Sequence, residues 1–215
     1  MVNQFVEFFD EWSAEYDNSV AGNDLEYKKV FEKYDEILEL IAFRSHGNVL
    51  EFGVGTGNLT KVLIEHGHQV IGVEPSSKMR EIAQQKLPDV TILDGHFLDF
   101  SYEGLKIDTI TSSYAFHHLT DEEKEQAIAL YASLLPEGGK IVFGDTIFPT
   151  KEDHEEAILK AKNNQFNRLA EDLSTEYYTT IPILDNIFKK YHFDTHYEQL
   201  NDFVWLIEAK KKEGA

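Results

Sequence analysis

The sequence has no cysteine, few basic residues and no long apolar run. Without cysteine the chain has no disulfide, no thiolate metal ligand and no cysteine nucleophile. Lys and Arg number 20 against 39 Asp and Glu, which gives a formal net charge of −19. Because phosphate contacts need clustered Lys and Arg, this balance argues against a nucleic-acid partner.

No stretch reaches the run of about 18 apolar residues that a membrane-spanning helix needs, so we expect no membrane association. The first residues, 1–12, carry acids where a signal peptide has a basic region followed by an apolar stretch. The protein is therefore expected in the cytoplasm.

The 215 residues suit one α/β domain with a cap. From about residue 47, short apolar runs alternate with amphipathic stretches whose apolar residues recur at helical spacing. This pattern predicts a mostly parallel, doubly wound sheet with helices on both faces. Thr120 and Glu123 form a capping-box signature at the start of one helix. The predicted parallel strands are Asn48–Phe52, Gln69–Glu74, Val90–Leu93, Ile107–Ser113 and Lys140–Asp145.

The two ends of the chain depart from this alternation. Two further strands, Phe193–Leu200 and Asp202–Ala209, are joined by a tight turn at Asn201-Asp202, and such a turn requires antiparallel pairing. The sheet is therefore expected to finish in an antiparallel hairpin. Within a single domain over 1–215, the expected segments are a helical cap (1–45), a core (46–148), a second helical region (149–191) and the terminal hairpin (192–210).

A glycine-rich loop follows the first predicted strand. Gly53, Gly55 and Gly57 stand at alternate positions, and a predicted helix begins directly after them. Glycine allows positive φ and a close approach of ligand to backbone, and the N–H groups of the helix start favour an electron-rich ligand group. The dinucleotide spacing G-x-G-x-x-G needs Gly or Ala at position 58, which is Asn58. A P-loop is excluded too, because no Lys-Ser/Thr pair follows the last glycine.

Two more polar segments follow the next predicted strands. Glu74 ends the second strand, where a carboxylate can accept hydrogen bonds from both hydroxyls of a ribose. The segment Asp94–Phe97 follows the third strand and can meet an adenine edge. The alternatives are a solvated strand-end acid at Glu74 and a tight strand–helix turn without a ligand.

In this order, these segments resemble class I S-adenosylmethionine-dependent methyltransferases, and most of all the small bacterial methyltransferases with uncharacterised substrates. The resemblance implies a Rossmann-like, doubly wound seven-stranded sheet, mostly parallel with an antiparallel C-terminal hairpin strand, plus an N-terminal helical cap. It also implies S-adenosyl-L-methionine as the cofactor and a small-molecule methyl acceptor. The matching segments are Glu51–Gly57, Glu74, Asp94–Phe97, Ser112–Leu119 and Leu135–Gly139.

The resemblance assigns roles to single residues. The three loop glycines, Gly53, Gly55 and Gly57, would lie under the methionine part of the cofactor. Glu51 would support this loop and face the amino group, and Glu74 would hold the ribose.

The adenine would be bordered by Asp94, His96 and Phe97. Where relatives often place a second acid, this chain has His96. Its imidazole accepts a hydrogen bond from an adenine amine only through an unprotonated nitrogen.

The resemblance predicts no particular catalytic residue, because the cofactor carries the activation and the protein supplies proximity and alignment. His117 and Tyr114 are the candidates if the acceptor is a hydroxyl or a thiol. The adjacent His117 and His118 point to different sides of an extended chain, so no shared metal site is predicted. Asp145, at the end of the fifth strand, either lines the acceptor side or is an ordinary strand-end acid.

The aromatic N-terminal segment has two interpretations. It either packs on the sheet or forms a lid over the cofactor, with Trp12, Tyr16 and Tyr27 as contacts. Two other functions stay open at this point: a non-catalytic protein that binds S-adenosylmethionine or S-adenosylhomocysteine, and an NAD-dependent oxidoreductase. The sequence pattern predicts neither the identity of the acceptor nor the oligomeric state.

Overall fold

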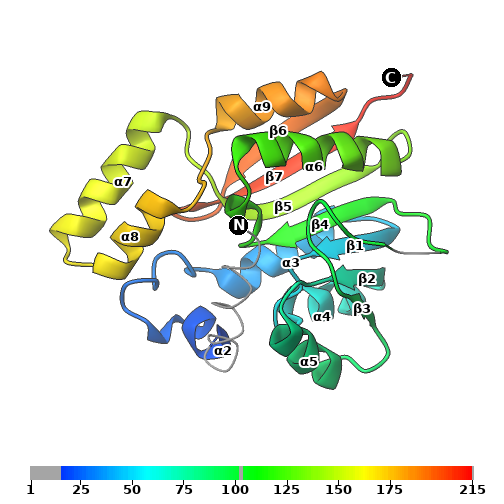
Figure 1. The fold of residues 1–215 in the computed structure, drawn as a ribbon, viewed down its shortest axis with the longest axis horizontal. Helices are drawn as coiled ribbons and strands as arrows, with labels where there is room; N and C mark the ends of the chain where they lie inside the picture. Colours follow the sequence, from blue (N-terminus) through cyan, green and yellow to red (C-terminus); the bar gives the residue numbers. More distant parts are fainter. Residues whose placement is uncertain (1–15, 102–103, 215) are drawn as a thin grey trace.

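The computed structural model describes residues 16–101 and 104–214. Its centre is a seven-stranded sheet in the order β3-β2-β1-β4-β5-β7-β6 (Figure 1). Strands β1 to β5 pair in parallel, whereas β7 is antiparallel to both β5 and β6. The strands are β1 Asn48–Phe52, β2 Gln69–Val73, β3 Thr91–Leu93, β4 Thr109–Ser113, β5 Lys140–Thr146, β6 Phe193–Gln199 and β7 Val204–Lys211.

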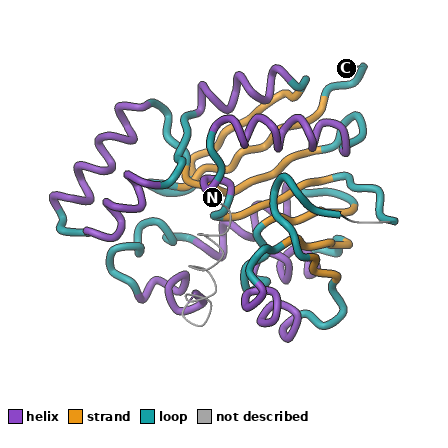
Figure 2. Tube along the Cα trace, in the orientation of Figure 1, coloured by secondary structure: helices purple, strands orange, loops and turns teal. Residues whose placement is uncertain are grey.

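Helices cover both faces of the sheet (Figure 2). Residues of α3 and α4 form one core with Val49 and Val142, while residues of α6 and α9 form the other with Phe52 and Phe143. None of the described helices is long and apolar enough to cross a membrane. The helices are α2 Tyr16–Asn18, α3 Tyr34–Arg44, α4 Asn58–Glu65, α5 Ser77–Lys86, α6 Asp121–Leu134, α7 Lys151–Asn163, α8 Asn167–Thr175 and α9 Ile181–Lys190, with a π-helix at Ser19–Asn23 and a 3-10 helix at Phe116–His118.

The predicted strands, the terminal hairpin and the capping box at the start of α6 are confirmed, with small changes at the strand ends. The hairpin turn is wider than expected, because residues 200–203 separate β6 from β7. Oδ1 of Asn201 accepts hydrogen bonds from the backbone N–H groups of Phe203 at 2.8 Å and Val204 at 2.7 Å. These bonds hold the chain in a local turn and keep it out of the strand ladder.

The two flanking segments are less continuously helical than predicted. In the described part of the cap, residues 24–33 form turns between the π-helix and α3. Gly22 with φ 81° and Lys33 with φ 64° interrupt the helical backbone there. Gln165, with φ 60°, likewise separates α7 from α8. The cap aromatics Phe5, Phe8, Phe9 and Trp12 lie outside the described residues.

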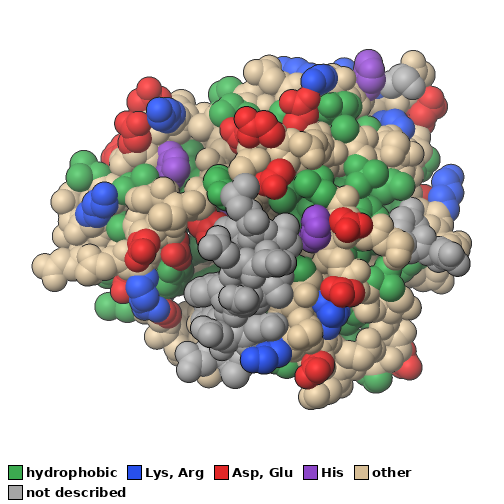
Figure 3. All heavy atoms as spheres, viewed as in Figure 1, with side chains coloured by type: hydrophobic (Ala, Val, Ile, Leu, Met, Phe, Trp, Pro, Cys, Tyr) green, Lys and Arg blue, Asp and Glu red, His purple; other side chains and the backbone are tan. Residues whose placement is uncertain are grey.

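Acidic and basic side chains are interspersed on the face of the molecule shown in Figure 3. Beneath that surface, the parallel strands β1, β2, β4 and β5 all end at one edge of the sheet. Ligands of open α/β sheets bind outside the carboxyl ends of their strands. The glycine loop, Glu74, Tyr114 and Asp145 all stand at this edge.

Candidate functional site

The loop between β1 and α4 places three glycines in the left-handed region, with φ of 68° at Gly53, 56° at Gly55 and 90° at Gly57. At Gly53 a Cβ would lie only 2.7 Å from Cβ of Ala115, so the turn after β4 approaches too closely for any other residue. At Gly55 the nearest atom to such a Cβ is Cε1 of Tyr16, at 4.0 Å. The loop therefore touches both the turn after β4 and the N-terminal cap.

Glu74 connects the end of β2 to this loop. Its carboxylate accepts hydrogen bonds from the N–H groups of Gly55, at 2.8 Å, and Ser76, at 2.9 Å. The side chain is buried, with 5% of the residue exposed. The structure thus brings the predicted ribose acid directly to the central glycine of the loop.

Glu51 lies one strand away and is almost completely buried. Its Oε2 accepts a hydrogen bond from Oγ1 of Thr60 at 2.6 Å, whereas Oε1 has no partner among the described residues. Oγ1 of Thr111, which is in register with Glu51 on β4, also lacks a partner there. Burial raises the pKa of Glu51 to about 8.

Two unsatisfied buried polar groups beside a glycine loop fit a ligand that brings a charged donor such as an ammonium group. A cation bound beside Glu51 would favour the ionised form of its carboxyl.

The segment after β3 is divided between surface and core. The Asp94 side chain is 76% exposed and pairs with Nη1 of Arg80 at 2.8 Å. Nδ1 of His96 accepts a hydrogen bond from the N–H of Leu98 at 3.3 Å. The ring of Phe97 is buried and stacks on another core ring 5.3 Å away, which leaves its backbone as the part nearest the surface at this position.

Arg80 is a site residue that the sequence analysis missed. Its Nη1 also donates to the carbonyl oxygens of Glu74 at 2.6 Å and Pro75 at 2.8 Å. It thereby joins the end of β2 to the segment after β3. The sequence did carry a signal for Arg80: it is a basic residue on the predicted helix that follows the strand-end acid Glu74.

The cap covers the loop through Asp17. Its carboxylate accepts hydrogen bonds from Oγ1 of Thr56 at 2.6 Å and Nδ2 of Asn58 at 3.2 Å, and it pairs with Nζ of Lys86 at 2.6 Å. Of the three predicted lid contacts, Tyr16 lies at the loop and Trp12 lies outside the described residues.

Tyr27, the third predicted lid contact, donates a short hydrogen bond to Asp172 of α8. It therefore joins the cap to the second helical region.

Tyr114 stands between the cap and the turn after β4. Its φ of 53° is unusual for a residue with a side chain, and its buried hydroxyl has no hydrogen-bond partner in the described chain. The ring lies 5.5 Å from that of Tyr34 and 5.2 Å from that of Phe31. A strained backbone and an unsatisfied hydroxyl at the carboxyl end of a strand are features of ligand-binding sites.

The predicted candidate His117 lies beside Asp145. Its Nδ1 is 2.6 Å from Oδ1 of Asp145, whose side chain is only 2% exposed. Burial alone would lower the pKa of His117, but the neighbouring carboxylate outweighs it and raises the pKa above its usual value. Asp145 is therefore a buried acid paired with His117 and not a solvated strand end.

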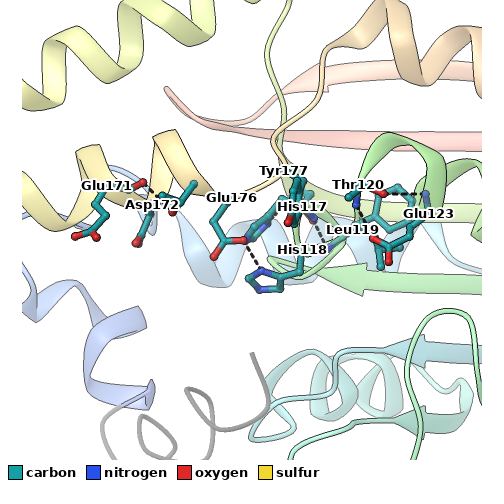
Figure 4. Close-up of polar contacts among 12 residues, drawn as sticks. His117, His118, Leu119, Thr120, Glu123, Glu171, Asp172, Glu176 and Tyr177 are labelled. Carbon is teal, nitrogen blue, oxygen red and sulfur yellow. Dashed lines mark hydrogen bonds and ion pairs between the residues drawn. The ribbon is translucent and has the colours of Figure 1, made fainter. Parts of the chain in front are cut away.

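His118 forms a second pair, with Nδ1 3.0 Å from Oε2 of Glu176 in the segment after α8 (Figure 4). The two imidazole rings are 4.2 Å apart but contact different carboxylates. Burial and the neighbouring His117 lower the pKa of His118. No group of acids and histidines suited to a metal ion occurs among the described residues.

Buried Lys124 supports both histidine pairs from α6. Its Nζ donates to the carbonyl oxygens of Leu119 and of Tyr177, the latter at 2.7 Å. Burial lowers its pKa to about 8. Sequence analysis missed Lys124 and Glu176, because a lysine on an amphipathic helix and an acid before a helix are ordinary surface residues in a sequence pattern.

Comparison with known proteins agrees with this architecture. Residues 49–139 match a methyltransferase domain. An uncharacterized methyltransferase of Oceanobacillus iheyensis is 54% identical over 98% of this chain and 99% of its own length. One from Bacillus cytotoxicus is 54% identical over 99% of this chain and 100% of its own length.

Solved structures of methyltransferases share the fold. Magnesium protoporphyrin IX methyltransferase from Synechocystis, determined with bound SAH, superposes with a TM-score of 0.75 at 18% identity, over 99% of this chain and 100% of that one. A SAM-dependent methyltransferase from Thermotoga maritima gives a TM-score of 0.67 at 18% identity, over 96% and 99%. With relatives more than half identical along almost the whole chain, this protein belongs to the methyltransferase family.

Proposed function

We propose that this methyltransferase transfers the methyl group of S-adenosylmethionine to a small-molecule acceptor by in-line displacement. The observation that carries the proposal is the contact of the buried Glu74 carboxylate with the N–H of Gly55, inside a loop of left-handed glycines. The contact supports the proposal because a carboxylate that can accept from ribose hydroxyls lies next to a backbone that a ligand can approach. Family membership and the neighbours solved with SAM or SAH support the choice of cofactor.

The described residues fit this cofactor part by part. The glycine loop would lie under the methionine part, and the unpartnered Oε1 of Glu51 would accept from the amino group. Glu74 would hold the ribose. Asp94, His96 and the backbone of Phe97 would border the adenine.

When bound, S-adenosylmethionine supplies a methyl group on a positively charged sulfonium, which leaves as a neutral thioether. The chain itself orients the reactants and excludes water. Asp17 closes the cap over the loop through Thr56 and Asn58, and the ring of Tyr16 stands over Gly55. These contacts enclose the loop on the side of the cap.

A small molecule is the proposed acceptor, because charges of both signs are mixed on a strongly acidic surface. The proposed location is the cytoplasm. Such a surface offers no continuous basic patch for a phosphate backbone on the face shown in Figure 3. A non-catalytic binder would use the same loop, so turnover separates it from an enzyme. An oxidoreductase would bind NAD.

Calorimetric titration with S-adenosylmethionine, S-adenosylhomocysteine and NAD tests the proposal. We expect micromolar binding of the first two and none of NAD. Glu74→Ala should nearly abolish binding. Glu74→Gln, which keeps the shape but loses the charge, should weaken it by about 10- to 100-fold, because hydrogen bonds to a charged acceptor are lost.

Glu81→Gln, at an exposed position of α5, is the matched control and should leave Kd unchanged. An unchanged Kd in a folded Glu74→Gln variant would remove the ribose assignment. NAD binding alone would replace the methyltransferase proposal by the oxidoreductase.

A further inference from the structure

Asp145 is held rigidly at the end of β5, outside the glycine loop. Its Oδ2 accepts from the backbone N–H groups of Phe116 at 2.6 Å and His117 at 3.2 Å, and its Oδ1 accepts from Thr146 N–H at 2.6 Å. Oδ1 is also the atom that contacts Nδ1 of His117. Several hydrogen bonds on one buried carboxylate fix its orientation and keep it ionised.

This contact determines the tautomer of His117. A carboxylate only accepts, so Nδ1 carries the proton and the lone pair of the neutral ring lies on Nε2. The ring stacks on Tyr178, with centroids 5.0 Å apart and an interplanar angle of 20°. No group of the described chain hydrogen-bonds to Nε2, and 12% of the side chain is exposed.

The turn that carries His117 packs directly against the glycine loop. Ala115 contacts Gly53 so closely that a Cβ at that glycine would overlap it. The backbone N–H of Tyr177 donates to the carbonyl oxygen of His117 at 3.1 Å and ties the other side of the turn to the segment before α9. The imidazole therefore stands between the cofactor loop and the second helical region.

We propose that Nε2 of His117 takes the proton of the methyl acceptor, that Asp145 positions and stabilises the imidazole, and that the acceptor bears an acidic hydroxyl or a thiol. This inference rests on the proposed function. As the acceptor's lone pair forms its bond to the methyl carbon, the electrons of the carbon–sulfur bond stay on sulfur. The acceptor's proton moves to Nε2 and leaves to solvent after product release.

The acceptor class follows from matching acidities. General bases work best when their pKa lies near that of the group they deprotonate and near the working pH. The pKa of the His117 imidazole is raised above its usual value of about 6.5, which brings it towards a thiol near about 8.5 or a phenol near about 10 and leaves it far from an aliphatic alcohol. An ammonium acceptor is disfavoured, because the carboxylates of Asp145 and Glu176 beside the two histidines would stabilise its charged form.

His118 is the weaker candidate although it has a similar partner. Glu176 is 17% exposed against 2% for Asp145, so solvent screens the second pair more strongly. His118 also lies beside the charge of a protonated His117, which opposes its own protonation.

The groups that face His117 come from several elements. Asp145 of β5 and Glu176 from the segment after α8 favour the protonated ring, while Lys124 of α6 opposes it. His118 lies next to it, and Tyr178 covers one ring face. Any titration of His117 therefore reports on all of these groups, and a variant of each carboxylate is needed to separate them.

NMR titration of the full chain with two ligands that differ by one charge tests the placement of Nε2. S-adenosylmethionine carries a sulfonium, and S-adenosylhomocysteine does not. If Nε2 faces the methyl group, the midpoint of His117 should be about 1 to 2 pH units lower in the first complex than in the second, because the sulfonium repels the imidazolium.

Two variants test the role of Asp145. Asp145→Asn should lower the titration midpoint of His117 both without ligand and in each of the two complexes. The matched variant Glu176→Gln should lower mainly the titration midpoint of His118. A His117 midpoint that is unchanged by Asp145→Asn would overturn the positioning role. Should Asp145→Asn fail to fold, the two-ligand comparison on the unaltered protein decides alone.

The acceptor class is tested with benzyl mercaptan, phenol and benzylamine at saturating S-adenosylmethionine, by measuring S-adenosylhomocysteine release. We expect release with the thiol or the phenol that falls at least tenfold in His117→Gln. Three results would overturn the proposed acceptor class. They are faster release with benzylamine than with the thiol or the phenol, release that His117→Gln leaves unchanged, and no release above the rate measured without an acceptor.

The outcomes also separate this inference from the proposed function. If both ligands bind but the His117 midpoint is the same in both complexes, the base assignment fails and the proposed function stands. If neither ligand binds, the proposed function fails and the base assignment fails with it.

Discussion

Glu51 makes the pH dependence of stability a direct test of the site. Its carboxyl group is 1% exposed, with a hydrogen bond from Thr60 on one oxygen and no partner on the other. In the unfolded chain the same group titrates normally. Burial therefore raises its pKa from 4.5 to about 8 on folding.

The sign follows from proton binding. Because the folded state holds the proton more tightly, the contribution of Glu51 to stability is fully present below pH 4.5 and is lost as pH rises towards about 8. At 1.36 kcal/mol per pKa unit, the loss amounts to about 3 kcal/mol at pH 7 and about 5 kcal/mol above pH 8. Both values are upper bounds, because water that enters the site weakens the penalty.

Glu51→Gln removes the ionisation and keeps the shape. The amide oxygen can still accept from Thr60, while the amide nitrogen is left as an unpaired buried donor that costs about 1 to 3 kcal/mol at every pH. We expect the variant to be less stable than the parent at pH 5 and more stable at pH 8.5. The difference between the two proteins should change by several kcal/mol across this range.

Urea unfolding followed by circular dichroism, at pH 5, 7 and 8.5, measures these free energies. The exposed Glu81→Gln variant controls for the lost charge. Parallel pH profiles for Glu51→Gln and the parent protein would refute the reasoning, because they would mean that Glu51 is ionised in the folded protein. The pH-independent amide penalty cannot produce this result, since it shifts the whole profile and leaves its slope unchanged.

Two further substitutions test the packing around the site. Gly53→Ala should lower the free energy of unfolding by more than about 2 kcal/mol, because the strain of a left-handed backbone adds to the overlap with the turn after β4. The control Gly67→Ala, at a position with φ 86° and no atom within 4 Å, should lower it by about 1 kcal/mol. Equal losses in urea unfolding would contradict the overlap. Tyr27→Phe should lose about 1 kcal/mol, because the partly buried Asp172 loses its hydrogen-bond donor. Tyr191→Phe should change stability little, because its partner Glu125 keeps an ion pair with Lys190. Similar values for the two tyrosine variants would show that the contact with α8 contributes nothing.

The arrangement of the glycine loop and Glu74 could be predicted because its signals are local, while their role towards a cofactor stays a prediction. The strand, the glycines and the helix that follow one another around Gly55 form one continuous segment. Glu74 could be predicted from its position at the end of a predicted strand alone. Because β1 and β2 are parallel neighbours, that position brings it to the loop. Short-range periodicity and strand direction are sufficient for such placements.

Other residues escaped because their environment depends on distant parts of the chain. Phe97 has the sequence position of an adenine contact, but its ring packs in the core against Phe52. His118 meets its carboxylate 58 residues further along the chain, and His117 meets Asp145 28 residues away. No periodic pattern encodes which acid meets which histidine, because tertiary packing decides it.

This difference bears on how the acceptor is selected. The loop around Gly55 contacts Glu74 at the end of β2, the cap and the turn after β4, whereas the side chain of His117 contacts Asp145 of β5 and Tyr178 from the segment before α9. A substitution in the second helical region can therefore change the charge and shape around Nε2 without touching the cofactor loop. Solved methyltransferases that share this fold at under 25% identity are then expected to agree in the loop and to differ around the acceptor. If His117 is the base, the chemistry of the acceptor has to be inferred from the carboxylates beside it, because the glycine loop would look the same for every acceptor.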